Sequence, residues 1–335
     1  MVPHNDIDAA AQALRDGQLV AFPTETVYGL GADATNGEAV ARGYAAKGRP
    51  SFNPLIAHVP DAEAAFALGD FGPEARALAT AFWPGPLSLV VPRAADCPVS
   101  LLASSGLGSI AIRVPAHPVA LDLLRATGRP VVAPSANPSG KISPTTAEHV
   151  RRHLKDKVAV VLDGGRCKVG VESTVVDLSG TRPRVLRPGG VGVEDLRDLL
   201  GDVDVVDRLV APDDAPVASP GEFLAHYSPG TPLVLVEGDG PAADALAAAL
   251  RSAGSDAAVL DLPAEGGAAA AIVYDRLRAA DADGHELLVG HLVDPVGLGR
   301  AVNDRLFRAA HGRVVSAELI EREAVVERLR ALLAP

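Results

Sequence analysis

The run Ser109-Ile-Ala-Ile-Arg-Val114 decides how the first half of this 335-residue chain folds. A short run rich in β-branched residues predicts a strand. Seven other runs have the same character, at residues 18–24, 55–59, 87–91, 130–134, 158–163, 172–178 and 183–187. The intervening sequence predicts helices at residues 7–17, 37–46, 61–68, 73–82, 117–127, 144–153 and 193–200. Because strands outnumber the helices between them, hairpins must occur beside crossovers, so we expect a twisted mixed α/β sheet.

The second half of the chain has a different organisation. Residues 210–232 contain five prolines and no apolar periodicity, which is typical of an extended linker. Strand and helix patterns then alternate regularly to a last helix after residue 316, which predicts a smaller parallel, doubly wound domain. We therefore expect a larger first domain at 1–208, a linker at 209–231 and a smaller second domain at 232–335.

Net charge, cysteine content and the length of apolar runs exclude some classes of protein. The net charge of −11 is uneven, at −2 for residues 1–208 and −9 for residues 209–335, which makes the second half a poor nucleic-acid surface. Cys97 and Cys167 form no Cys-x-x-Cys pair, so we expect neither zinc nor a disulfide framework, and a reducing, cytoplasmic location. The N-terminal residues do not resemble a signal peptide, and no run of about 18 apolar residues predicts a membrane span.

Two glycine motifs imitate a dinucleotide fingerprint. Residues 29–34 and 106–111 both match Gly-x-Gly-x-x-Ala. The fingerprint needs a strand, the glycine turn and then a helix. Thr-Asn-Gly after Ala34 does not continue a helix, and the chain from Ser109 onward has strand character. We therefore reject both matches.

Residues 46–55, Ala-Lys-Gly-Arg-Pro-Ser-Phe-Asn-Pro-Leu, place two cations one glycine apart. A residue before proline favours extended backbone, which applies to Arg49, and side chains two positions apart in an extended chain point the same way. We therefore expect Lys47 and Arg49 to project together, with Gly48 leaving the backbone approachable. A point charge beside a planar fork suits a di- or triphosphate. A solvated basic turn is the alternative, and the motif alone favours it.

The same arrangement of polar residues before proline recurs in this half of the chain. Ser135 and Asn137 are two positions apart, and Asn137 precedes Pro138, as Asn53 precedes Pro54. Arg187 precedes Pro188, and Arg113 puts a charge in a run of strand character. Each taken alone is better explained as a turn former or an edge-strand charge, but their recurrence in one domain weakens that explanation.

His58 and several hydroxyl residues are further candidates. His58 alternates with apolar neighbours in a strand and is either a packed side chain or a ligand. Thr26, near a strand end, and Ser173, in Glu-Ser-Thr-Val-Val, suit a close-fitting polar pocket or are ordinary β-formers. No Ser/His/Asp order or Cys/His pair predicts a protein nucleophile.

Taken together, these motifs closely resemble the threonylcarbamoyl-AMP synthase family, whose catalytic part is the YrdC-like domain. The resemblance covers residues 5 to about 208 in the motif order of the family, and the later residues resemble the C-terminal Rossmann-like domain of its long two-domain form. The motifs that carry it are FPTETVYGLGADA (22–34), AKGRPSFNPLIAHV (46–59), WPGPLSLVV (83–91), IAIRVPAHP (110–118), PSANPSGKISPTTAEHV (134–150), ESTVVDL (172–178), VLRPGGV (185–191), VYDRLRAAD (273–281) and GLGRAVNDRLFRAA (297–310).

The resemblance implies an enzyme, a nucleotidyltransferase that condenses L-threonine, bicarbonate or CO2, and ATP into threonylcarbamoyl-adenylate and pyrophosphate. It implies a concave, positively charged pocket and Mg2+ bound through the ATP phosphates, with no metal-ligating residue. The implied downstream partner is a transferase that passes the threonylcarbamoyl group to adenosine beside the tRNA anticodon.

By motif position, the resemblance also implies roles for individual residues. Lys47 and Arg49 would be catalytic, holding the phosphates during attack by the substrate's own carbamate oxygen. The ATP-binding residues would be Lys47, Arg49, Asn53, Ser109, Ser135, Asn137, Ser143, Arg187 and Tyr227. The L-threonine-binding residues would be Thr26, His58, Arg113 and Ser173.

The linker departs from the pattern of the family. Family linkers commonly read Pro-Gly-Met-x-Tyr-x-His-Tyr-x-Pro, and here Glu222 and Leu224 replace the methionine and the first tyrosine. A lid role for Tyr227 is still expected. Two rival hypotheses remain: an RNA-binding module of the same fold, possessing no synthase activity, and a carbamoyl-transfer domain of the hydrogenase-maturation type.

Overall fold

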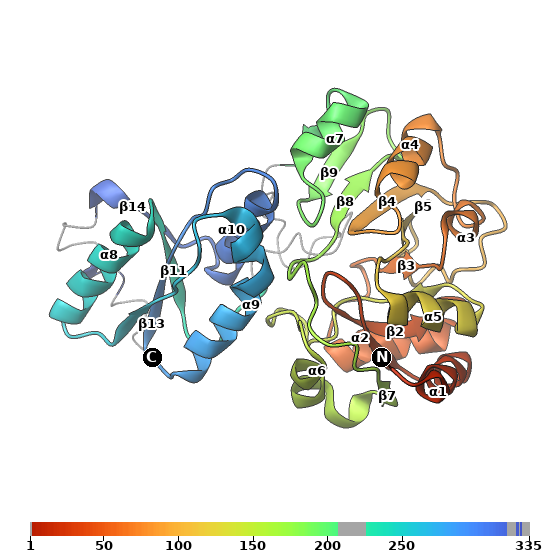
Figure 1. The fold of residues 1–335 in the computed structure, drawn as a ribbon, viewed down its shortest axis with the longest axis horizontal. Coiled ribbons are helices and arrows are strands. Elements are labelled where there is room, and N and C mark those ends of the chain that lie inside the picture. Colours follow the sequence, from red (N-terminus) through yellow and green to blue (C-terminus); the bar gives the residue numbers. More distant parts are fainter. Residues whose placement is uncertain (1, 207–225, 320–325, 328, 330–335) are drawn as a thin grey trace. The chain divides into compact units, whose positions relative to one another are not determined.

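The computed structural model describes residues 2–206, 226–319, 326–327 and 329 (Figure 1). The chain divides into two compact units. The first comprises Met1–Ser139 and Ser143–Glu222, and the second comprises Gly140–Ile142 and Phe223–Pro335. Most of the predicted linker at 209–231 lies outside the described residues, so the predicted domain boundaries stay a prediction.

The first unit is built on one ten-stranded sheet, in the order β10-β9-β8-β4-β5-β3-β6-β2-β1-β7. Parallel neighbours such as β4 and β8 stand beside antiparallel neighbours such as β4 and β5. This confirms the predicted mixed sheet. The strands are β1 (Val20–Pro23), β2 (Tyr28–Asp33), β3 (Ile56–His58), β4 (Leu87–Pro92), β5 (Ser109–Arg113), β6 (Val131–Val132), β7 (Val160–Val161), β8 (Thr174–Asp177), β9 (Arg184–Arg187) and β10 (Asp204–Val205).

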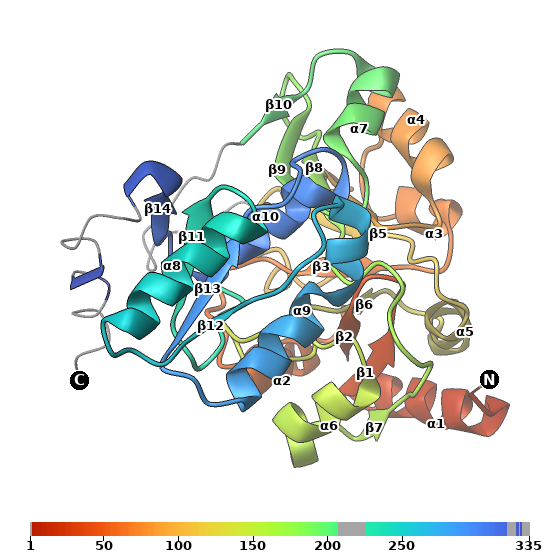
Figure 2. The ribbon, with the colours of Figure 1, turned by 60° about the vertical axis from the view of Figure 1, so that its left-hand side comes forward.

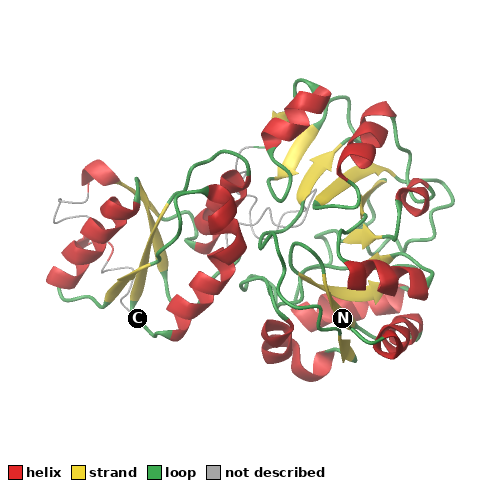
Figure 3. Cartoon of the chain, in the orientation of Figure 1, coloured by secondary structure: helices red, strands yellow, loops and turns green. Residues whose placement is uncertain are grey.

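Local sequence explains where the helices of this unit begin and end. Asn36 caps one helix by accepting hydrogen bonds from two backbone N–H groups, and Gly48 ends it in the left-handed conformation with φ 62°. The helices, drawn in red in Figure 3, are α1 (His4–Arg15), α2 (Gly37–Lys47), α3 (Ala62–Phe66), α4 (Pro73–Phe82), α5 (Pro118–Thr127), α6 (Ala147–Leu154), the 3-10 turn η1 (Lys155–Lys157) and α7 (Val193–Leu200).

The two faces of the sheet pack against different clusters of side chains. Leu87 and Leu89 of β4, together with Ile110 and Ile112 of β5, enter the main core, which also includes side chains of α2, α4, α6 and α7. Residues one position along point to the other face, because side chains alternate along a strand. Part of that face is covered by α1 and α5, and a small cluster around Val90 lies elsewhere on it.

Two strands of the first unit were absent from the sequence prediction, β2 and β10. The glycines of the first fingerprint-like motif lie inside β2, which pairs with β1 and β6. A Cβ on Gly31 would lie 2.9 Å from the ring of Phe22, so this glycine serves close packing. The rejection of a dinucleotide site in both glycine motifs is therefore confirmed, since the second motif leads into β5.

The second unit contains a four-stranded, all-parallel sheet in the order β12-β13-β11-β14 (Figure 2). Figure 3 shows this sheet between α8 on one side and α9 and α10 on the other, which confirms the predicted doubly wound arrangement. Its strands are β11 (Leu233–Glu237), β12 (Ala257–Val259), β13 (Leu287–His291) and β14 (Val314–Ser316), and its helices are α8 (Gly240–Ser252), α9 (Gly266–Ala282), α10 (Leu298–Ala309) and the 3-10 turn η2 (Ala317–Leu319).

Three residues from the middle of the chain complete the second unit. Lys141 forms a parallel bridge with Ser228, whose N–H donates to the carbonyl of Gly140 at 2.8 Å. Arg278 of α9 donates to the carbonyl of Ile142, also at 2.8 Å. The predicted last helix falls largely outside the described residues. In the part of the chain that is described, no helix has the length and apolar character needed to cross a membrane.

Candidate active site

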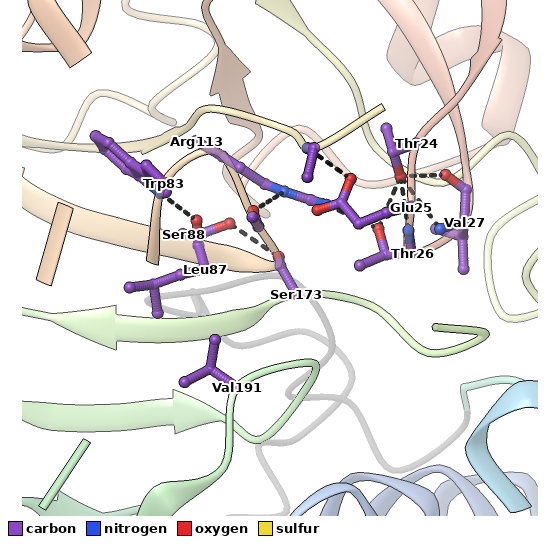
Figure 4. A network of polar contacts seen from close by, with 12 residues as sticks. Thr24, Glu25, Thr26, Val27, Trp83, Leu87, Ser88, Arg113, Ser173 and Val191 are labelled. Carbon is purple, nitrogen blue, oxygen red and sulfur yellow. Dashed lines mark hydrogen bonds and ion pairs between the residues drawn. The ribbon is translucent and has the colours of Figure 1, made fainter. Parts of the chain in front are cut away.

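Arg113 ends β5 as a buried cation on the face of the sheet opposite the main core. Its Nε donates to the carbonyl of Gly85 at 3.2 Å. Its Nη2 donates to Glu25 Oε1 at 2.5 Å and to Thr26 Oγ1 at 3.0 Å. Figure 4 shows the guanidinium reaching toward the turn that carries both residues. The structure thus brings together two of the predicted threonine-binding residues, Arg113 and Thr26.

Ser173 links the predicted threonine and ATP residues. Its Oγ shares a hydrogen bond of 2.8 Å with Ser88 Oγ, from the neighbouring strand β4 (Figure 4). Arg187 of β9 donates from Nη2 to the Ser173 carbonyl at 2.8 Å and to Ser173 Oγ at 3.1 Å. The side chains of Ser88 and Arg113 share one face, since Val90 and Ala111, two positions away on the same strands, belong to one cluster.

His58 is buried on the same face, with its Nδ1 3.1 Å from the carbonyl of Ile56 and the ring of Phe22 packed edge-on against it. Burial, helped by the positive charge of Arg113, lowers the pKa of His58 to about 3. The imidazole is therefore neutral at physiological pH. It can offer one donor and one acceptor to a ligand or to the backbone, but no charge.

Lys47 and Arg49 are both buried, but the sequence analysis was wrong about the backbone between them. Lys47 is the last residue of α2, and Gly48 reverses the chain in the left-handed conformation, so the segment is not extended. The Arg49 N–H donates back to the carbonyl of Tyr44 at 3.0 Å, and its guanidinium contacts the carbonyls of Asn53 and Pro54. The residues are brought together by a helix C-terminus, in place of strand alternation.

The ammonium of Lys47 holds the Ser-x-Asn loop in place. Its Nζ donates to the backbone carbonyls of Ser135 and Asn137, while its own carbonyl accepts from the Ser139 N–H at 2.8 Å. Burial, and then the nearby charge of Arg49, lowers the pKa of Lys47 well below its usual value, against an opposing effect of Glu172. An added anion would be favoured here, because it would stabilise the charged form of the lysine.

Two further contacts lie among the predicted ATP residues. Ser143 donates from Oγ to Glu172 Oε1 at 2.6 Å. Asn53 Oδ1 is buried and has no hydrogen-bond partner among the described residues. A buried acceptor without a donor is costly, so Asn53 points to a ligand that carries one.

The structure leaves two predicted residues apart from these contacts. Ser109 lies half-buried at the start of β5, on the same face as Arg113 but about 13 Å away along the strand. Tyr227 belongs to the second unit, where its ring stacks on Tyr274 at 5.7 Å and lies 5.4 Å below the guanidinium of Arg305. Their predicted ATP contacts stay predictions.

The sequence analysis assigned no role to three polar residues that complete these networks, Glu25, Ser88 and Glu172. Ser88 carried a detectable signal, since it is the one hydroxyl in the apolar run of residues 87–91. Glu25 and Glu172 carried none beyond their place beside Thr26 and Ser173. In the described ranges, no group of three or more His, Cys, Asp and Glu side chains could hold a metal ion.

The fold and this site define a two-unit α/β protein with several buried cations in its first unit. A family profile described as "Telomere recombination" (Sua5, YciO and YrdC) matches residues 12–189, and one described as "Threonylcarbamoyl-AMP synthase, C-terminal domain" matches residues 191–311. Threonylcarbamoyl-AMP synthase of Bacillus subtilis is 40% identical over 92% of this chain and 94% of its own. The chain belongs to the threonylcarbamoyl-AMP synthase family, in its two-domain form.

Solved structures agree with this assignment. The crystal structure of Pyrococcus abyssi Sua5 complexed with L-threonine matches with a TM-score of 0.89 and 38% identity, over 94% of this chain and 97% of that one. A curated threonylcarbamoyl-AMP synthase from Pyrococcus abyssi is likewise 38% identical over 92% of this chain and 95% of its own. A putative threonylcarbamoyl-AMP synthase of Mycobacterium tuberculosis is 45% identical over 58% of this chain and 89% of its own.

Proposed function

We propose that this protein is an L-threonylcarbamoyl-adenylate synthase, which forms threonylcarbamoyl-AMP and pyrophosphate from L-threonine, bicarbonate or CO2, and ATP. The observation that carries the proposal is the presence of two groups of buried cations in the first unit. One centres on Arg113 and suits an amino-acid carboxylate, and the other centres on Lys47 and Arg49 and suits a triphosphate. Arg187 adds a further buried cation, hydrogen-bonded to Ser173. Family membership supports the same reaction.

The chemical step needs no nucleophile from the protein. A carbamate oxygen of N-carboxy-threonine attacks the α-phosphorus of ATP, a new O–P bond forms, and the bond from that phosphorus to the bridging oxygen breaks, releasing pyrophosphate. Negative charge grows on the phosphate oxygens during this displacement. Lys47 and Arg49 stabilise it as fixed, buried cations that need no reorganisation.

Threonine recognition follows from the other network. The Arg113 guanidinium pairs with the substrate carboxylate, and Thr26, His58 and Ser173 surround the rest of the amino acid with neutral hydrogen-bonding groups. A site built to satisfy the threonine hydroxyl rejects analogues that lack it, because its own buried polar groups would be left unpaired.

ATP binding takes the remaining predicted residues. Asn53 offers its unsatisfied Oδ1 to the nucleotide, and we propose that Ser135, Asn137, Ser143 and Arg187 contact it as well. Mg2+ would be held through the phosphate oxygens of ATP and would supply further positive charge. The charged side chains proposed to contact ATP are cations, which do not ligate a metal ion. This fits a metal carried by the phosphates of the substrate better than one held in a cage of protein ligands. We also propose contacts from Ser109 and Tyr227.

The product is an activated threonylcarbamoyl group, so its consumer must be a transferase that acts on a nucleophilic amine. We propose that this consumer is the tRNA threonylcarbamoyl-transferase, which modifies adenosine beside the anticodon, and that the reaction takes place in the cytoplasm. Any direct contact with RNA is expected to be weak, because the chain carries a net charge of −11.

Pyrophosphate release with each substrate omitted in turn tests the proposal. Release should require L-threonine, bicarbonate and ATP together, and Arg49→Ala should abolish it while the fold remains intact. Arg42→Ala is a matched control, since Arg42 is an exposed cation on α2, the helix that ends just before Arg49. Release that continues when threonine is omitted would contradict the assignment, and undiminished turnover in the Arg49 variant would contradict the phosphate role.

A further inference from the structure

Glu25 is a buried carboxylate that the proposed mechanism does not use. It lies in the turn between β1 and β2, where Thr24 Oγ1 donates to the Val27 carbonyl at 2.6 Å and accepts from the Thr26 and Val27 N–H groups at 3.2 Å (Figure 4). These bonds fix the backbone on both sides of Glu25. Its side chain is 9% exposed, so its position has few alternatives.

Each oxygen of the Glu25 carboxylate has its own donor. Oε1 accepts from Arg113 Nη2 at 2.5 Å, and Oε2 accepts from the Ala116 N–H at 3.0 Å. Ala116 follows Arg113 by three residues, just beyond the end of β5. The carboxylate therefore bridges the guanidinium and the backbone that follows it, and holds the two in one register.

These bonds leave one end of the guanidinium available. Nε and Nη2 form one edge of the planar group, and that edge is occupied by Gly85, Glu25 and Thr26. Nη1 makes no hydrogen bond with any residue in the part of the chain that the structure describes. A planar guanidinium that is hydrogen-bonded along one edge presents its remaining N–H groups in a fixed direction.

We propose that Glu25 is the positioning residue for threonine binding: it turns Arg113 Nη1 toward the substrate carboxylate and neutralises the excess charge of the guanidinium. This inference rests on the proposed function. The charge of Glu25 also affects which anion binds at Arg113. Lys47, Arg49 and Arg187 already supply cations for phosphate, and an uncompensated Arg113 would attract phosphate as well. Glu25 keeps the amino-acid side of the pocket from becoming a second anion site.

Glu25→Gln tests the inference at nearly constant size. An amide has one oxygen and so can serve only one of the two donors, which loosens the clamp. By titration calorimetry we expect the Kd for L-threonine to rise about tenfold to a hundredfold, the range for one charge-assisted hydrogen bond. The Kd for ATP should change less than about twofold. L-threoninol, which lacks the carboxylate, should bind both proteins equally, and inorganic pyrophosphate should begin to compete with threonine.

A second variant and a matched control separate positioning from mere stability. Glu25→Asp keeps the charge, and so the compensation of Arg113, but cannot span both donors, so it should lose threonine affinity selectively and to a smaller extent. Asp33→Asn weakens another ion pair of a buried carboxylate, that of Asp33 with the part-exposed Arg129 at 2.6 Å, which has no bond to Arg113. It should lower thermal stability and leave the ratio of threonine to ATP affinity unchanged.

The outcomes are distinguishable. If the Glu25 variants weaken threonine, threoninol and ATP alike, or behave as Asp33→Asn does, the positioning role is wrong although the synthase function stands. A wild-type protein that binds no threonine would overturn the proposed function and this inference with it.

Discussion

Protonation of His58 should limit the stability of the first unit in mild acid. The folded protein holds this imidazole neutral, with a pKa of about 3, because burial and then the charge of Arg113 disfavour the imidazolium. In the unfolded chain the group titrates at its ordinary value of 6.5. Below that value the unfolded state binds a proton that the folded state does not bind, so stability falls as the pH drops from 6.5 toward 3.

The magnitude follows from these two values. Between about pH 7.5 and about pH 5, proton binding to the unfolded state alone removes about 2 kcal/mol from the free energy of unfolding. This figure changes little for any folded-state pKa below about 4, because the folded protein is then almost fully unprotonated at pH 5. It is a large share of the stability of an ordinary domain, about 5–15 kcal/mol.

Urea unfolding at the two pH values measures this effect. The chain has a single tryptophan, Trp83, which lies in the first unit and donates from Nε1 to the Leu87 carbonyl, so its fluorescence reports on the unit that contains His58. His58→Asn keeps an N–H donor for the Ile56 carbonyl but cannot titrate. His4→Asn, at a side chain that is 84% exposed, is the control.

The wild type and His4→Asn should lose about 2 kcal/mol more than His58→Asn between the two pH values. The three proteins otherwise have the same titratable groups, so the contribution of those groups cancels in the comparison. Equal losses in the wild type and His58→Asn would refute the reasoning, since they would mean that His58 is protonated in the folded protein.

Three further predictions follow from the same structure. ATP binding should be accompanied by the uptake of a proton, because a triphosphate raises the lowered pKa of Lys47. Calorimetry in buffers of different ionisation enthalpy should show this uptake at a pH below that at which an ordinary lysine titrates. The variant Lys47→Arg should abolish the uptake. Gly189→Ala should cost about 3 kcal/mol in urea unfolding and weaken both substrates, because its Cβ would lie 2.3 Å from the Glu172 carbonyl oxygen; Gly180→Ala, with open space around it, should be nearly neutral. Asp304→Ala should destabilise the second unit by about 3–5 kcal/mol in thermal unfolding followed by circular dichroism, because the carboxylate pairs with two buried arginines of α10; a loss below about 1 kcal/mol would contradict the importance of these pairs.

Local signals predicted the secondary structure well where they were strong. The bounds of α4 and α7 match the prediction, since Pro73 begins one helix and Gly201 follows the other. The strand β2 was missed because its two glycines lower strand propensity. Pairing with β1 and β6, which no local pattern contains, stabilises it nonetheless.

In the candidate site, too, local sequence signals could be recognised, whereas contacts between distant residues could not. Arg113 and Ser173 were recognisable as polar residues in apolar runs, and Lys47 and Arg49 as clustered cations. The sequence could not show that Glu25 pairs with Arg113, 88 positions away, because ion pairs between distant segments leave no local trace. The geometry of Lys47 was mispredicted because the restriction from Pro50 acts on Arg49 alone, while Gly48 ends a helix.

The order of strands in the ten-stranded sheet has a consequence for the time at which the pocket forms. Thr26 comes from the first tenth of the chain and Arg187 from beyond its middle, and β4 can pair with β8 only after residues 174–177 have been synthesised. Sheets dominated by contacts between distant segments fold slowly, because long loops must close before pairing stabilises them. Because the proposed threonine and ATP sites include Ser173 and Arg187, we expect substrate binding to stabilise the finished domain and not to guide its early folding.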